Sequence, residues 1–194
     1  KILNDLDRVD TKKYRPFLVE FYYNLTACYY PISNQKVITC YIKALDLAED
    51  LKNIDDDIYN ASSSEIYFVL LSFWLSTNHT SNLDISYYMS KYEEVLSKMN
   101  VERYKEHLIK GYYVIGNLFE YQGDNIKLEQ YYKKCWNILK DIDDKIIQDD
   151  FADIFNDVSI KIQEWRGTRK NVAVIKQEES GRTSFVDKLW RRKK

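Results

Sequence analysis

Residues 111–136 decide the fold: GYYVIGNLFEYQGDNIKLEQYYKKCW contains two helical patterns separated by one turn. The apolar face of the first pattern is formed by Tyr112, Ile115, Gly116 and Phe119, at positions i, i+3, i+4 and i+7. Gly123 and Asp124 then break the pattern, as the residues of a tight turn do. A second apolar face follows and consists of Leu128, Tyr132 and Cys135. The stretch therefore predicts two antiparallel helices joined by a tight turn.

This pattern recurs along the chain at a spacing of 45 residues, which indicates a helical repeat. An aromatic pair, followed by an aliphatic residue, begins at Tyr22, at Tyr67 and at Tyr112. The chain has only five glycines and two prolines, which favours long helices. We expect the end of a preceding repeat at 1–9, repeats at about 11–54, 61–99 and 102–145, and a last helix at 149–165. We therefore also expect the chain to be part of a longer array.

The unit at 111–136 resembles a tetratricopeptide (TPR) repeat. The TPR pattern runs from a large aromatic through Leu-Gly, a second aromatic and a Gly-Asp turn to a small-aromatic-small second helix. The matching residues here are Tyr112, Ile115-Gly116, Phe119, Gly123-Asp124, Leu128, Tyr132 and Cys135. Leu128 and Cys135 are larger than the family pattern, and the period exceeds the usual TPR length of about 34 residues. The resemblance implies an all-α fold, with antiparallel helix pairs stacked as a TPR-like right-handed superhelix.

The residues exclude several classes of function. No apolar run is long enough to span a membrane. The three cysteines have no close pair and no metal-type spacing, so we expect reduced thiols, at least partly buried in helices of an intracellular protein. We find no nucleophile with a base, no phosphate loop and no metal-ligand set, and His79 and the 55–57 aspartates lack ligand spacing. We expect a non-enzymatic protein without a cofactor or a metal.

Charge is distributed unevenly. Residues 166–194 hold ten basic and three acidic side chains, a net charge of +7. The whole chain has a net charge of −1, so residues 1–165 have a net charge of −8. An acidic stretch also occupies 141–157, which we interpret as a solvated face or, alternatively, as a docking face for a basic peptide. We expect 166–194 to be a basic C-terminal tail with a short amphipathic segment at 183–190.

The tail allows two interpretations. It covers the last repeat, since arrays need a polar cap, or it is a basic signal for nuclear import or nucleic-acid contact. The candidate docking or targeting residues are Phe185, Leu189, Trp190, Arg191, Arg192, Lys193 and Lys194. We expect nucleic acid to bind only through this tail. The basic C-terminus favours the nucleus slightly over the cytoplasm.

The TPR resemblance assigns partner binding to a concave groove lined by the first helix of each pair. Carried over by position, the groove residues are Tyr23, Tyr30, Phe68, Lys110, Tyr113, Asn117 and Tyr121, together with Glu20, Ala27, Glu65, Ser72, Leu75 and Glu120. Tyr23, Phe68 and Tyr113 would form an aromatic ladder along it. The alternative is that these three rings only pack between repeats.

The function expected from this resemblance is a protein–protein interaction scaffold or adaptor, part of a larger complex, that binds a protein or peptide segment along the groove. One alternative is a peptide-sensing regulator, because residues 21–47 are similar to the repeats of bacterial peptide-pheromone receptors of the Rap type. A second alternative is a nuclear scaffold whose basic tail contacts nucleic acid.

Overall fold

The computed structural model describes residues 2–30, 32–52, 54–77, 82–142, 151–165 and 167. All regular structure in these residues is α-helical, as expected, and eight helices lie in them. They are α1 (Ile2–Val9), α2 (Thr11–Tyr29), α3 (Asn34–Glu49), α4 (Asp56–Ser76), α5 (Ile85–Lys98), α6 (Lys105–Gln122), α7 (Asn125–Leu139) and a helix over 152–165.

The chain divides into two units, residues 1–140 and 141–194, and each is described by itself. The first unit contains α1 to α7. In the second unit, the described helix over 152–165 falls within the last helix predicted at 149–165. The predicted tail lies outside the described residues apart from position 167, so its boundary at 166 stays a prediction.

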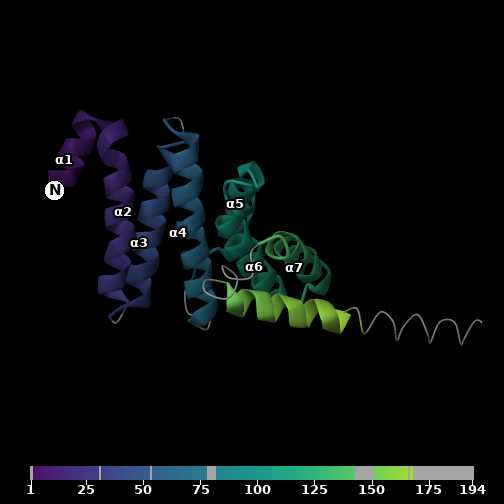
Figure 1. Cartoon of the computed structure of the whole chain (residues 1–194). Helices are drawn as coiled ribbons and strands as arrows, with labels where there is room; N and C mark the ends of the chain where they lie inside the picture. The colour runs from purple at the N-terminus through teal and green to yellow at the C-terminus, as the bar shows by residue number, and fades with distance from the viewer. Residues whose placement is uncertain are drawn as a thin grey trace, which may run out of the picture. The chain divides into compact units, whose positions relative to one another are not determined.

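In the first unit, each helix packs against its neighbour in the sequence. The closest associations are α2 with α3, α6 with α7 and α4 with α5, which are the pairs that the sequence pattern predicted. Helices α2, α3 and α4 run side by side in Figure 1. Helix α4 also packs against α6, so the first helices of two successive pairs lie next to each other.

Side-chain caps explain where several helices begin. Asp10 accepts a hydrogen bond from the backbone N–H of Lys13 at 3.0 Å, and Ser33 accepts one from Lys36 at 3.4 Å. Aspartate and serine are among the residue types that most favour the N-cap position, because their side-chain oxygens accept from the first free N–H groups. The Gly123–Asp124 turn is confirmed, because Gly123 ends α6 with a φ of 74°, in the left-handed region that favours glycine.

The predicted start of the second pair was wrong. The sequence predicted the repeat from about residue 61, with 55–57 as a solvated link and the apolar helix from Glu65, but α4 already begins at Asp56. The Asp55 carboxylate caps the helix by accepting from the N–H groups of Asp57 and Ile58, both at 3.0 Å. The polar run is helical because its side chains Asn60, Ser63 and Ser64 are buried rather than solvated.

The second helix of the first pair is shorter than predicted. Helix α3 ends at Glu49 rather than near Ile54. Beyond it, the N–H groups of Leu51 and Ile54 bond to carbonyls three residues back, at 2.8 Å each, so the chain turns while Leu51 stays buried.

The cysteines match the expectation in part. Cys40 and Cys135 are buried, but Cys28 is exposed, contrary to the prediction. Thr26 lies on the buried face of α2, and Cys28 follows two residues later, about 200° around the helix. Among the described residues, no helix combines the length and the apolar character needed to cross a bilayer.

Candidate functional site

A cavity of about 300 Å³ lies between α2 and α4, the first helices of the first two pairs. Its lining residues are Pro16, Val19, Glu20 and Tyr23 from α2 and Ser62, Glu65 and Ile66 from α4. The spacing within each set is i, i+3 or i+4, which is one helical face. Each helix therefore presents a single stripe to the cavity.

The base of the cavity is apolar. Val19 and Ile66 are buried, and Tyr23 is half-buried, its ring 6.2 Å between centroids from the ring of Tyr41 on α3. Pro16 lies inside α2, where its ring fixes the backbone and contributes no N–H. These side chains make up the uncharged part of the cavity's lining.

Carboxylates lie at the more exposed part of the cavity. Glu20 is exposed and Glu65 is partly exposed. Burial, followed by the negative charge of Glu65, raises the pKa of Tyr23, so its hydroxyl is neutral at pH 7. The cavity thus combines an apolar base, a neutral hydroxyl and two anionic groups.

The polar surface continues from α4 to α6. The Lys110 ammonium lies 3.5 Å from Glu65 Oε2 and 5.7 Å from the ring centroid of Phe68. His107, one turn earlier on α6, is half-buried, and burial lowers its pKa although the charge of Glu65 opposes that shift. Lys110 therefore links two of the predicted groove positions on the neighbouring helix.

Aromatic contacts join the far ends of the same helices. The Tyr30 ring meets Phe73 of α4 edge-on, with centroids 5.9 Å apart. The Tyr121 ring meets Trp74 of α4 in the same manner at 5.5 Å. Tyr30 and Tyr121 are both more than half exposed. These two predicted groove residues thus both contact α4, Tyr30 from just beyond the end of α2 and Tyr121 from α6.

Tyr113 and Asn117 have a different environment. Tyr113 stacks on Tyr132 of α7, with centroids 5.9 Å apart, and the Tyr132 hydroxyl donates a hydrogen bond to Asn117 Oδ1. Both residues are half-buried. The ladder rings Tyr23 and Tyr113 therefore contact the second helix of their own pair.

Sequence reasoning missed Pro16, Val19, Ser62 and Ile66. A signal was available for Pro16, Val19 and Ser62, because each lies three or four residues from an assigned groove position on the same helix, and Ile66 lies four residues from Ser62. The resemblance assigned positions from two residues before the repeat's first aromatic onward, so its earliest positions, Glu20 and Glu65, come about one turn after Pro16 and Ser62.

The remaining candidates are the tail, His79 and the aspartates at 55–57. The tail residues Phe185, Leu189, Trp190, Arg191, Arg192, Lys193 and Lys194, as well as His79, lie outside them. Where the structure describes the chain, no group of three or more histidine, cysteine or acidic residues is arranged to hold a metal ion. Asp57 instead accepts from the Tyr104 hydroxyl at 2.8 Å and pairs with Arg103 at 2.5 Å.

Comparisons of the chain with protein-family models, with characterised proteins and with solved structures found no match.

Proposed function

We propose that the helix pairs form a TPR-like right-handed superhelix, and that the chain is a non-enzymatic interaction scaffold within a larger complex. Its partner is a protein or peptide segment, extended or helical, that lies along the groove formed by α2, α4 and α6. Stacked helix pairs create such concave surfaces through the small rotation from one repeat to the next.

One observation supports this proposal: predicted groove positions from three separate repeats share a cavity or contact one another. Glu20 and Tyr23 share a cavity with Glu65, and Glu65 and Phe68 both contact Lys110. These residues are up to 90 positions apart in the sequence. Partly exposed aromatic rings beside charged groups are the composition that specific interfaces favour.

Affinity capture from native extract, with identification by mass spectrometry, tests the proposal. The groove variant carries Tyr23→Ala and Phe68→Ala, and the matched control carries Tyr87→Ala and Ile126→Ala, two exposed residues of the second helices α5 and α7. Tyr113 and Asn117 are left intact because both contact Tyr132. Melting temperatures of both variants check that the fold survives.

We expect a partner that is captured by the parent chain and by the control variant but lost from the groove variant. A partner lost only when the chain is cut after residue 166 would move the function to the tail. A partner retained by every variant would contradict the groove. If a short synthetic peptide from the partner binds as tightly as the whole partner, the peptide-sensing alternative is favoured over the scaffold.

A further inference from the structure

We propose that the cavity between α2 and α4 binds a lysine or arginine side chain of the partner segment. This inference rests on the proposed function, because it specifies the chemistry that one part of the groove selects. It makes the partner a basic segment and the cavity its anchoring point.

The shape of the cavity suits such a side chain. Lysine and arginine bury an aliphatic stem against apolar surface and keep the charged head near water. Val19 and Ile66 at the base are buried, with 4% and 2% of their surface exposed, whereas Glu20 is exposed at the rim. An apolar base below an acidic rim matches the two ends of a basic side chain.

The carboxylates have capacity for an additional cation. Among the ion pairs of the described residues, none involves Glu20. Glu65 pairs with Lys110 through Oε2 only, at 3.5 Å, and a carboxylate offers about four lone-pair sites. Two carboxylates against one ammonium group leave the site with a charge of −1, which an incoming cation neutralises.

The wider charge pattern points the same way. Residues 1–140, the unit that contains the cavity, hold 17 basic and 19 acidic side chains, a net charge of −2, so this unit weakly attracts basic segments and repels acidic ones. The neutral Tyr23 hydroxyl and ring add a hydrogen-bonding group and an aromatic face, both of which an arginine guanidinium uses.

The experiment uses the full chain, labelled with ¹⁵N, and a small probe rather than an unidentified partner. N-acetyl-arginine amide is titrated while backbone amide shifts are followed, and N-acetyl-citrulline amide serves as the neutral isostere. We expect saturable shifts that centre on Val19, Tyr23, Ser62 and Glu65 and that weaken as NaCl is raised. Citrulline amide is expected to produce none of them.

Variants then test the carboxylates. Glu20→Gln with Glu65→Gln should weaken binding of the arginine probe at least about tenfold, because two charge-assisted contacts are lost. Glu102→Gln with Glu106→Gln removes the same charge from exposed positions near the start of α6 and should leave binding within about twofold. Spectra of both variants show whether the fold is intact.

Equal shifts with citrulline amide, shifts centred away from the cavity, or equal weakening in both double variants would overturn the inference. These outcomes are separate from those of the capture experiment. A partner lost from the Tyr23→Ala and Phe68→Ala variant, together with an arginine probe that does not bind, would leave the scaffold in place and reject the basic anchor. Probe binding without a groove-dependent partner would reject the scaffold instead.

Discussion

At Gly116, α6 and α7 lie too close for any side chain. A Cβ built there would overlap the ring of Tyr132, which is fully buried. The ring cannot move aside easily, because it also stacks on Tyr113 and hydrogen-bonds to Asn117. This is the physical reason for a glycine at the centre of the stretch that decides the fold.

We predict that Gly116→Ala lowers the free energy of unfolding by about 1–3 kcal/mol, since overpacking outweighs the better helix propensity of alanine. Gly111→Ala is the matched comparison, because its Cβ would meet the Leu96 methyl groups at 2.6 and 2.7 Å and the Tyr92 hydroxyl at 2.9 Å, all of them the ends of side chains. We expect Gly111→Ala to lower the free energy of unfolding by less than Gly116→Ala does. Urea denaturation measures both, and a Gly116→Ala variant at least as stable as the parent would contradict the close approach.

The cysteines should differ in reactivity. Cys28 is exposed, whereas Cys40 and Cys135 are buried, and burial raises the pKa of Cys135 to about 12. We predict that iodoacetamide at pH 8 labels Cys28 in the folded protein and labels the other two only after unfolding, because the thiolate is the reactive form. Peptide mass spectrometry locates the label. Rapid native labelling of Cys135 would show that the packing of α6 against α7 is wrong.

His107 should make stability sensitive to mild acid. Its folded-state pKa is lowered, mainly by burial, against the opposing charge of Glu65, with Lys110 and Glu106 also nearby. Below its ordinary pKa of about 6.5, the unfolded chain binds a proton that the folded protein resists. His107 therefore reduces stability progressively as the pH falls from about 6.5, and the full stability is present above that value.

We predict that the parent loses more free energy of unfolding between pH 7.5 and pH 5.5 than His107→Gln does. Urea denaturation at both pH values measures the difference. The carboxylates of Asp57 and Glu94 have lowered pKa values, so their contribution is lost at more acidic pH and is common to both proteins. Identical pH dependence in the two proteins would contradict the burial of the imidazole.

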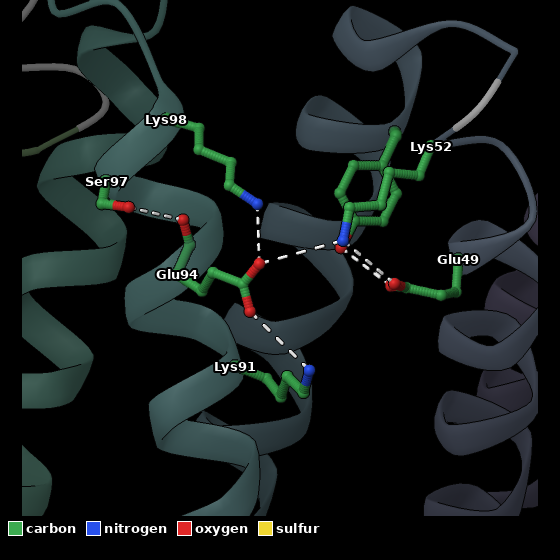
Figure 2. A network of polar contacts seen from close by, with 7 residues as sticks. Glu49, Lys52, Lys91, Glu94, Ser97 and Lys98 are labelled. Carbon is green, nitrogen blue, oxygen red and sulfur yellow. Dashed lines mark hydrogen bonds and ion pairs between the residues drawn. The ribbon is translucent and has the colours of Figure 1, made fainter.

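At the scale of the helices, one ionic network joins three segments, as Figure 2 shows. On α5, Glu94 Oε1 lies 2.6 Å from Lys98 Nζ and Glu94 Oε2 lies 3.7 Å from Lys91 Nζ. Glu94 Oε1 also lies 3.8 Å from the Nζ of Lys52, which follows the end of α3. Lys52 in turn lies 3.3 Å from Glu49. All these side chains are more than a third exposed, so the network positions helix surfaces without supplying much stability.

We predict that Glu94→Gln costs less than about 1 kcal/mol in the free energy of unfolding at low salt, and that the difference shrinks in 1 M NaCl. Glu106→Gln, an exposed residue on α6, is the control and should cost less. Urea denaturation at both ionic strengths measures the four values. A loss that is larger than this and insensitive to salt would mean that Glu94 contributes by packing rather than by charge.

Helix boundaries show what local sequence could predict. The caps Asp10 and Ser33 and the Gly123 turn act through residues within one turn of themselves, so the sequence pattern was sufficient. The start of α4 was not predictable in this way. The polar residues near its start adopt a helix because their side chains are buried against other helices. For example, Ser64 Oγ lies 3.4 Å from the hydroxyl of Tyr92 on α5. Such tertiary contacts override the local preference of serine for turns.

At the scale of the whole molecule, the repeat spacing was sufficient to predict an all-α chain and the order of its helix pairs. It was not sufficient to predict the cavity, which depends on how far α2 stands from α4 and on which side chains fill the space. Glu20 and Glu65 are 45 residues apart, and only packing places them around one space. The same holds for Lys110, whose contacts with Glu65 and Phe68 cross from one pair to the next.

Site-specific photo-crosslinking in native extract tests the groove most directly. A photoreactive phenylalanine analogue replaces Tyr23 or Phe68 on the groove side, and Tyr87 or Ile126 on the second helices as controls. We predict that the same partner is crosslinked from both groove positions and from neither control. A partner crosslinked from Tyr87 or Ile126, with none from Tyr23 and Phe68, would contradict it and place binding on the second helices.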